Sequence, residues 1–256
     1  MPLTGGNMNS VARLGDTVLR SAQAWTPSVH SLLAHLHQSG FTCCPRPLGF
    51  SADGREVLEF IEGDTWPEVA ADVVWSPSSL IGAGCVLQAL HSSQQEYKPP
   101  ADAVWSDIAA DPVGDASVIC HNDWAVYNGV YRHRELVAML DFDVASPGRQ
   151  IWDFAYAVFT WVPLCDPRDV RGLGTPLDLP GRLRLLAEAY GIELVREGLT
   201  TVIDRRFNLL MAGLDQRVRE GGPFSPELAG HVPYYERAAA FLAGNLAGIV
   251  AEAGLS

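Results

Sequence analysis

The fold of this chain is decided by residues 118–157, which read VICHNDWAVYNGVYRHRELVAMLDFDVASPGRQIWDFAYA. Within this apolar stretch, polar residues stand in three clusters. They are His121, Asp123 and Asn128 in the pattern H-x-D-x-x-x-x-N, then Asp141 and Asp143 in Leu-Asp-Phe-Asp, and finally Asp153. Taken singly, such residues are more often turn or cap residues than catalysts. Their shared order and spacing make the functional interpretation the stronger one.

Two short β-rich runs lie between the first and second clusters. Residues 129–131 and 136–140 flank the polar segment 132–135, which is the pattern of a β-hairpin. Asn128 precedes one arm of this hairpin, and Asp141 follows the other. Because a hairpin returns the chain to its starting point, we expect Asn128 and Asp141 to be neighbours.

An amide and one or two carboxylates that meet at one point form a site made of oxygen atoms only. Mg²⁺ prefers such ligands, and it keeps water molecules and substrate phosphates as its other ligands. Asp123 lies five residues before Asn128, on a loop that follows a short apolar strand at residues 117–120. From this loop, the carboxylate of Asp123 can act on a substrate hydroxyl.

The spacing of these residues matches the arrangement used for phosphoryl transfer in protein kinases, where a loop Asp accepts the hydroxyl proton and Asn and Asp side chains hold Mg²⁺. This chain has His-Asn-Asp and Asp-Phe-Asp instead of the protein-kinase forms. It therefore resembles the aminoglycoside phosphotransferase and choline kinase group. The resemblance implies a two-lobed, protein-kinase-like α+β fold. Its small antiparallel-β, nucleotide-binding lobe is expected at residues 1–63, and a mostly helical lobe with the catalytic loop and acceptor site at residues 64–256.

The resemblance also implies roles for individual residues, with ATP or GTP as co-substrate and Mg²⁺ as cofactor. The implied assignments are Asp123 and His121 as catalytic residues, Asn128, Asp141 and Asp143 as metal ligands, Asp153 as the brace of the catalytic loop, and Glu59 and Ile61 as the backbone that pairs with adenine. For Asp143, a role as a turn or cap residue is the alternative.

The sequence departs from this family in its small lobe. A kinase-like fold places a Lys on its third strand, paired with a Glu of the following helix, but the only lysine of this chain is Lys98, far downstream. Arg20 stands where the Lys is expected, and the helix expected at residues 28–39 contains no acidic residue. Arg can bind phosphate through two nitrogens, but it differs from Lys in shape and reach. Either Arg20 anchors the triphosphate, or nucleotide binding is weakened or lost.

The acceptor site is expected beside Asp123. Asp166 is a candidate contact for a cationic acceptor, as are Asp169 and Asp215, although each of them alone is more often a solvated surface charge. Trp124 directly follows Asp123 and is a candidate to line the acceptor pocket. The alternative is that Trp124 belongs to the core, which is the commoner fate of an aromatic residue in an apolar segment.

Two classes of function are compatible with these residues. The first is an ATP- or GTP-dependent phosphotransferase that acts on a hydroxyl of a small molecule, such as an aminoglycoside-like antibiotic or another amino-containing compound. The second is a non-catalytic protein of the same fold that binds a small molecule or peptide and confers immunity or regulates a pathway. The retained Asp123, Asn128 and Asp141 favour the first class, and the missing Lys–Glu pair and short small lobe favour the second.

The composition limits which partners and which cellular compartment are compatible with this chain. Hydrophobic residues make up 48% of the 256 residues and charged residues 19%, which is typical of a globular protein. The net charge of −12 argues against nucleic acid as a partner, since no basic surface offsets phosphate repulsion. No apolar run is long enough to span a bilayer, and the N-terminus lacks the pattern of a secretory signal. Five cysteines without metal-binding spacing then favour a cytoplasmic protein with reduced thiols.

Turn signals and apolar periodicity predict the remaining elements. Two hairpins are expected in the small lobe, at residues 10–21 and 46–60. Helices are expected at residues 28–39, 78–92, 151–161, 182–190, 194–220 and 233–253. The Gly-rich start at residues 4–9 is either a loop over phosphates or a disordered terminus.

Overall fold

The computed structural model describes residues 11–170, 177–195, 198–221 and 225–255. The Gly-rich start at residues 4–9 lies outside these described residues. The described chain begins with β-strands and ends with helices, and this order separates the molecule into two parts.

The first part is a four-stranded antiparallel sheet in the order β1-β2-β4-β3. Its strands are β1 (Ala12–Leu14), β2 (Thr17–Arg20), β3 (Pro47–Phe50) and β4 (Glu56–Glu59). Tight turns close both hairpins, where Gly15 and Gly54 adopt φ angles of 60° and 81° that a side chain would disfavour. Both predicted hairpins are confirmed. The pairing of β2 with β4 joins them into one sheet and sets Arg20 directly opposite Glu56.

Helix α1 (Thr26–Gln38) follows β2 and contacts strand β3. Pro27 stands in its first turn, where the missing backbone N–H would have no partner within the helix. Val29, Leu32 and Leu36 recur at helical spacing and are buried, with exposed fractions of 2% or less. This packing holds His30 near the sheet, where its imidazole contacts Glu56.

Four short strands form two antiparallel pairs in the middle of the chain. Strand β5 (Val118–Cys120) pairs with β8 (Ser146–Gly148), and β6 (Gly129–Arg132) pairs with β7 (Glu135–Met139). The second pair confirms the predicted hairpin, and its turn residues His133 and Arg134 have φ angles of 52° and 69°. Positive φ at both central residues is typical of a type I′ turn. A bridge between Asp64 and Tyr131 ties this hairpin to the segment that leaves the small sheet.

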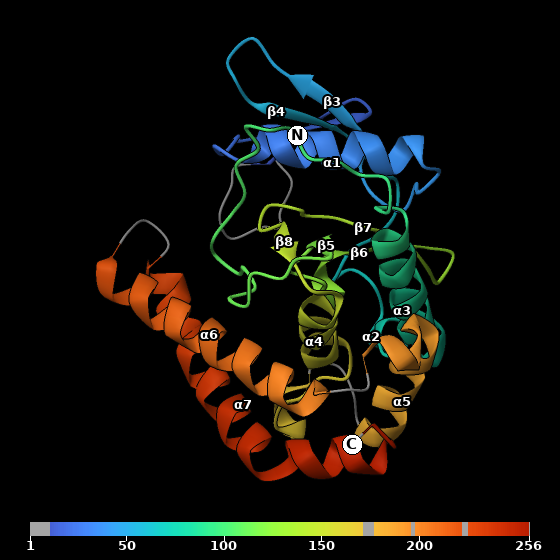
Figure 1. Cartoon of the computed structure of the whole chain (residues 1–256), viewed down its shortest axis with the longest axis vertical. Helices are drawn as coiled ribbons and strands as arrows, with labels where there is room; N and C mark the ends of the chain where they lie inside the picture. The colour runs from blue at the N-terminus through green and yellow to red at the C-terminus, as the bar shows by residue number, and fades with distance from the viewer. Residues whose placement is uncertain (1–10, 171–176, 196–197, 222–224, 256) are drawn as a thin grey trace.

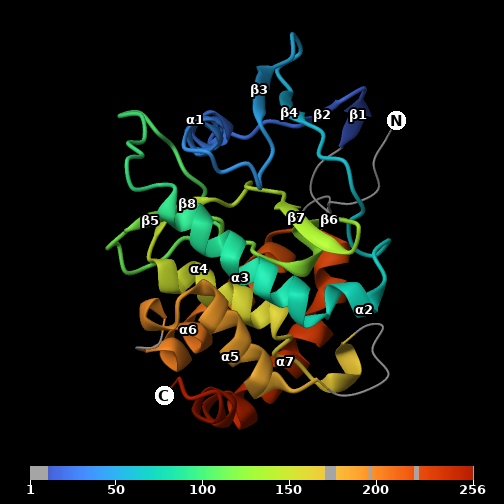
Figure 2. The ribbon, with the colours of Figure 1, turned by 90° about the vertical axis from the view of Figure 1, so that its right-hand side faces the viewer.

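The second part of the molecule is built from helices. They are α2 (Ala71–Val74), α3 (Pro77–Ser92), α4 (Gln150–Trp161), α5 (Leu179–Tyr190), α6 (Leu199–Glu220) and α7 (Ser225–Glu252). The apolar core continues through these helices, and Trp124, Trp152 and Trp161 are fully buried in it. Figures 1 and 2 show the small sheet with α1 at one end of the molecule, α4 to α7 at the opposite end, and the strand pairs β5–β8 and β6–β7 between them. Among the described residues, no helix has the length and apolar character needed to cross a membrane.

Three predicted helix starts differ from the structure by three residues or more. The helix expected from residue 182 begins at Leu179. The helix expected from residue 194 begins at Leu199, because residues 192–194 form a separate 3-10 turn. The helix expected from Pro233 begins at Ser225, so Pro233 lies inside it. Proline lacks a backbone N–H and weakens a helix interior, which is why the sequence pattern indicated a start at this residue. Helix α7 packs against α6 and α5.

Candidate active site

The loop after β5 is held in place by the buried carboxylate of Asp153, in the first turn of α4. Its Oδ2 accepts a hydrogen bond from the backbone N–H of His121 at 2.7 Å, and its Oδ1 accepts one from the N–H of Asn122 at 2.8 Å. The imidazole Nε2 of His91 lies 3.0 Å from Oδ2. Burial alone would raise the pKa of Asp153, but the contacts with His91 and the loop hold the pKa below its usual value. Asp153 therefore stays charged and fixes the backbone of the loop.

Asn122 carries the sharp bend of this loop, with a φ angle of 65°. Its amide Nδ2 donates to the carbonyl oxygen of Val144 at 3.0 Å and to the hydroxyl of Ser146 at 2.8 Å. The buried guanidinium of Arg206 donates to the backbone oxygen of Asn122 at 2.8 Å. Sequence reasoning did not identify Asn122 or Arg206 as supports of the site. The available signal was the tolerance of Asn for positive φ.

His121 is fully buried, and both of its ring nitrogens have partners. Its Nε2 lies 2.9 Å from the carbonyl oxygen of Leu140, and its Nδ1 accepts a hydrogen bond from the N–H of Asp123 at 3.2 Å. Burial lowers the pKa of His121, so the ring is neutral and donates from Nε2. The ring holds the loop against the segment that leads to Asp141. A catalytic role for His121 stays a prediction.

Asp123 lies at the end of this braced segment and is partly buried. Its Oδ1 accepts a hydrogen bond from the hydroxyl of Tyr127 at 2.6 Å, and its Oδ2 accepts one from Nδ2 of Asn128 at 2.8 Å. Burial raises the pKa of Asp123 to about 7, and the charge of Asp141 adds to this effect. The hydroxyl of Tyr156 lies 3.2 Å from that of Tyr127. Sequence reasoning did not identify Tyr127 or Tyr156 as contacts of the site, because their approach to the carboxylate depends on the fold.

Asn128 and the start of the Asp-Phe-Asp segment meet, as the hairpin predicts. The backbone N–H of Leu140 donates to the carbonyl oxygen of Asn128 at 2.8 Å, and Asp141 is the next residue. Because Nδ2 of Asn128 donates to Asp123, the amide oxygen of Asn128 is the side-chain atom left to bind a cation.

Arg20 joins the small sheet to this segment through three carboxylates. Its Nε donates to Oε2 of Glu56 on β4, its Nη1 donates to Asp141 at 3.0 Å, and its Nη2 lies 2.6 Å from Asp143. The sequence places no acidic residue in the helix expected at 28–39. In the structure, the acidic partner of Arg20 is Glu56, which lies on strand β4. Glu56 could not be found from the sequence, because its pairing with Arg20 depends on strands separated by a helix.

The oxygen atoms of Asn128, Asp141 and Asp143 fit Mg²⁺ in their chemistry, since they are hard ligands that bring negative charge. Within the described part of the chain, no group of three or more His, Cys, Asp or Glu side chains could hold a metal ion. The guanidinium of Arg20 bridges the two carboxylates. Arg20 contacts Oδ1 of each carboxylate, so a cation that binds these two oxygens would have to replace Arg20, whereas a cation that binds the second oxygens would not.

Glu59 and Ile61 lie where the small sheet passes into the larger part of the molecule. Glu59 is the last residue of β4, and its backbone N–H donates to the carbonyl oxygen of Arg46 at 2.9 Å. Ile61 follows two residues later and is partly buried. Their pairing with adenine stays a prediction.

The candidate acceptor residues have other partners. Trp124 is fully buried, and its indole Nε1 donates to the backbone oxygen of Ala83 at 3.2 Å, so it takes the core position that was its alternative. The three candidate carboxylates each form an ion pair with an arginine. The pairs are Asp166 with Arg168 at 2.6 Å, Asp169 with Arg237 at 2.6 Å, and Asp215 with Arg219 at 2.8 Å. A cationic acceptor would have to compete with these arginines. The side chain that lies exposed beside Asp123 is instead Tyr127, with an exposed fraction of 46%.

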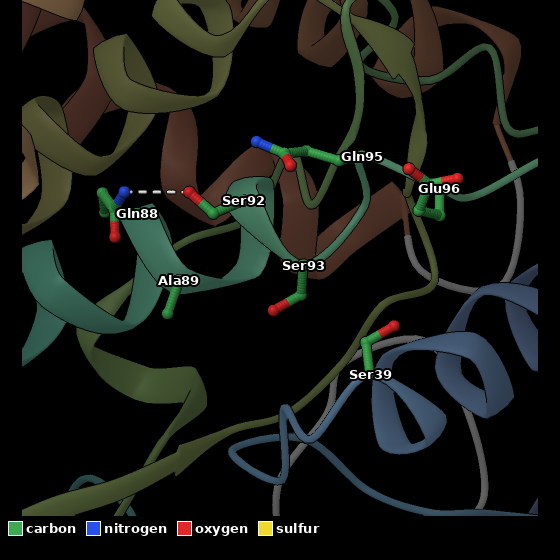
Figure 3. Close-up of a pocket in the computed structure, with 7 residues that line it drawn as sticks. All are labelled: Ser39, Gln88, Ala89, Ser92, Ser93, Gln95 and Glu96. Atoms are coloured by element: carbon green, nitrogen blue, oxygen red, sulfur yellow. Dashed lines mark hydrogen bonds between the residues drawn. The ribbon is translucent and has the colours of Figure 1, made fainter.

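A shallow hollow of about 480 Å³ lies between the C-terminal ends of α1 and α3 (Figure 3). It is lined by Ser39, Gln88, Ala89, Ser92, Ser93, Gln95 and Glu96. Gln88 and Ser92 satisfy each other by a hydrogen bond of 2.8 Å. None of the residues of the candidate active site lines this hollow.

Comparison with known proteins identifies the family. The profile of the phosphotransferase enzyme family matches residues 84–186, which contain Asp123, Asn128 and Asp141. The trifolitoxin immunity protein of Rhizobium leguminosarum bv. trifolii is 34% identical over 201 residues, which are 77% of this chain and 76% of that protein. The chain belongs to the phosphotransferase enzyme family. The predicted relationship to this family is thereby confirmed.

Solved structures of several small-molecule kinases and phosphotransferases share the fold. The microcompartment-associated aminopropanol kinase is 16% identical and superposes with a TM-score of 0.65, covering 97% of this chain and 92% of its own. A choline/ethanolamine kinase family protein from Mesorhizobium loti is 16% identical, with a TM-score of 0.57 over 94% and 91% of the two chains. An aminoglycoside phosphotransferase from Streptomyces rimosus, in complex with ADP and streptomycin, is 14% identical, with a TM-score of 0.55 over 82% and 92%. They confirm the two-lobed, kinase-like α+β fold.

Proposed function

We propose that this protein uses ATP or GTP, with Mg²⁺, to phosphorylate a hydroxyl of a small molecule. The observation that carries the proposal is the carboxylate of Asp123, which contacts Asn128 on a loop fixed by Asp153. Two further carboxylates, Asp141 and Asp143, follow the hairpin that returns to Asn128. A base, an amide and two carboxylates in this order are the groups that phosphoryl transfer needs.

In the proposed reaction, the acceptor oxygen forms a bond to the γ-phosphorus, and the bond from that phosphorus to the β–γ bridging oxygen breaks. Asp123 orients the acceptor hydroxyl and takes its proton, and the nucleoside diphosphate leaves. Because the pKa of Asp123 is about 7, its carboxylate is matched to proton transfer near neutral pH. Tyr127 and Asn128 each donate to one oxygen of this carboxylate and thereby fix its orientation.

The nucleotide is bound from both lobes in this proposal. Bound Mg²⁺ supplies positive charge to the β- and γ-phosphate oxygens. Asn128, Asp141 and Asp143 would hold the ion, and Arg20 would exchange Asp141 and Asp143 for phosphate oxygens, which a guanidinium binds through two nitrogens. The backbone at residues 59–61 would pair with the base.

The acceptor is proposed by analogy with the relatives. One relative is named for immunity to trifolitoxin, and a solved aminoglycoside phosphotransferase binds streptomycin. We therefore propose an antibiotic-like or other amino-containing acceptor with a hydroxyl group, which the protein inactivates by phosphorylation in the cytoplasm. Nucleic acid and membranes are not proposed partners, in keeping with the net charge of −12.

A second candidate function is binding without catalysis. It is favoured by the contacts of Arg20 with both Asp141 and Asp143, because these contacts satisfy the carboxylates without a metal ion. The name of the immunity protein is compatible with sequestration of a toxin as well as with its modification. In this alternative, the protein would bind a small molecule or peptide at the same loop and would need no nucleotide.

Thermal unfolding with added nucleotide separates the two functions. A ligand that binds only the folded protein raises the melting temperature, by an amount equivalent to about 2.7 kcal/mol at 100 times its Kd. We expect Mg·ATP or Mg·GTP to raise the melting temperature, and acceptor-dependent ADP or GDP release to follow in a panel of amino sugars, amino alcohols and short peptides. Stabilisation by an acceptor but by neither nucleotide would instead support the binding function.

A further inference from the structure

The small sheet buries an ion pair between Arg20 and Glu56. Arg20 and Glu56 are directly opposite each other on the antiparallel strands β2 and β4. Their side chains are 10% and 1% exposed, and Nε of Arg20 donates to Oε2 of Glu56. Burying two charges has a desolvation cost that can exceed their mutual attraction, so this pair is weak evidence for stabilisation of the fold.

The guanidinium of Arg20 presents different edges to its partners. Its Nε faces Glu56 in the small lobe, whereas Nη1 and Nη2 face Asp141 and Asp143 in the larger lobe. Because the guanidinium is planar and rigid, a carboxylate that holds Nε also sets the direction of both Nη atoms. A Lys ammonium is a single point charge and could not be aimed in this way.

The second oxygen of Glu56 is held by the helix. Oε1 lies 2.9 Å from Nε2 of His30 on α1, and the ring of His30 stacks on Phe50 at 4.9 Å between centroids. Burial alone would raise the pKa of Glu56, but the contacts with His30 and Arg20 hold the pKa below its usual value. His30 thus connects α1 to Arg20 through a charged Glu56.

We infer that Glu56 and His30 are positioning residues that aim Arg20 at the phosphates of the nucleotide. The inference rests on the proposed function, since it assigns Arg20 to those phosphates. Four elements meet in the arrangement: β2 supplies the cation, β4 the carboxylate, α1 the imidazole, and β3 the ring that supports it. In this chain, the acidic partner of the cation comes from a strand, and the helix acts on that partner.

The inference is tested by nucleotide affinity. The Kd of Mg·ATP or Mg·GTP is measured by calorimetry on the full chain, well below the melting temperature of every variant. Glu56→Gln should weaken binding roughly tenfold or more, equivalent to about 1.4 kcal/mol, because Nε of Arg20 loses its charged partner. His30→Ala should weaken binding by a smaller factor. His30→Gln, whose amide can still donate to Glu56, should restore most of the affinity.

A matched control comes from the same hairpin. Asp53 is ion-paired with Arg55 in the exposed turn between β3 and β4, so Asp53→Asn also removes one paired carboxylate and should leave the affinity unchanged. A double-mutant cycle then separates positioning from stability. In an Arg20→Ala background, Glu56→Gln should weaken binding by less than twofold, because Glu56 has no arginine left to aim.

The outcomes distinguish this inference from the proposed function. If the wild-type protein binds neither nucleotide, the proposed function fails, and the inference fails with it. If the wild-type protein binds nucleotide and Glu56→Gln binds it equally well, the inference alone is overturned. It is also overturned if Glu56→Gln costs the same factor with and without Arg20, because Glu56 then acts independently of the cation.

Discussion

The loop that carries Asp123 and the cluster around Arg20 face the same site, but they are held in different ways. The loop is fixed within the larger lobe by groups that are enclosed, and its brace Asp153 has no exposed surface. Arg20 is shared between the lobes, and the side chains of its larger-lobe partners Asp141 and Asp143 are 39% and 20% exposed. Breaking an enclosed charge contact is costly, whereas a partly exposed one exchanges easily with solvent or ligand. In the proposed function, the base is therefore preorganised, and the half of the site that would bind the phosphates is adjustable.

The sharpest separation of the two regions should come from Asp123→Asn. Turnover should fall roughly 10²–10⁴-fold, the usual contribution of a positioned base, while the Kd of the nucleotide stays nearly unchanged. Steady-state kinetics and calorimetry on the same preparation measure both. A variant that loses nucleotide affinity in step with turnover would show that the two halves of the site are not separable.

Asp153→Asn should affect stability before it affects chemistry. The substitution removes a buried charge that accepts from the loop backbone and contacts His91, so we expect a loss of about 3–5 kcal/mol in the free energy of unfolding. Denaturant unfolding measures it. Asp215→Asn, which removes an exposed partner of Arg219, is the control and should cost at most about 1 kcal/mol. Equal losses in the two variants would mean that the loop is not braced as described.

Asp141→Asn should act on the cluster around Arg20, which is the adjustable half of the site. Removing one carboxylate weakens the hold on Mg²⁺, so the affinity for Mg·ATP should fall roughly tenfold, equivalent to about 1.4 kcal/mol, and turnover should fall with it. The stability of the nucleotide-free protein should change by at most about 1 kcal/mol, since the Asp141 side chain is substantially exposed. Calorimetric titrations with and without Mg²⁺ measure the effect. An affinity loss of the same size without Mg²⁺ would assign Asp141 to the nucleotide rather than to the ion.

The pH dependence of turnover should report on the base. The reaction needs the Asp123 carboxylate free of its proton, so the rate should fall as the pH falls through about 7. Tyr127 donates to this carboxylate and favours its charged form. Tyr127→Phe should therefore raise the pKa of Asp123. The fall in rate at acid pH should then occur at a higher pH, by less than about one pH unit, because the lost hydrogen bond contributes about 1 kcal/mol. Tyr97→Phe is the control, because Tyr97 packs on His35, and it should leave the pH at which the rate falls unchanged. A shift of this fall to lower pH in Tyr127→Phe would contradict the hydrogen bond from Tyr127 to Asp123.

The two regions also differed in how far the sequence could define them. The catalytic loop, the hairpin and α4 come from one continuous stretch, so Asp123, Asn128, Asp141 and Asp153 could be related by spacing alone. The cluster around Arg20 is assembled from strands and a helix that are distant in sequence, and Glu56 could not be identified before the pairing of β2 with β4 was known.

The roles of single side chains were harder to predict than the positions of the elements. His121 and Trp124 lie in the motif, but burial turns the first into a support of the loop and the second into a core residue. Asp166 has the charge expected of an acceptor contact, yet it is paired with Arg168. Burial and pairing are properties of the folded chain, so spacing could not reveal them.

Transfer of labelled phosphate tests the central claim most directly. The wild-type protein is incubated with Mg²⁺ and nucleotide labelled in the γ-phosphate, together with each compound of the acceptor panel, and Asp123→Asn is treated identically. We expect label on a hydroxyl of at least one acceptor with the wild-type protein, and at least a hundredfold less with Asp123→Asn. Equal transfer by both proteins, or tight binding of an acceptor by the wild-type protein with no label transferred to it, would contradict the assignment of this site to phosphoryl transfer.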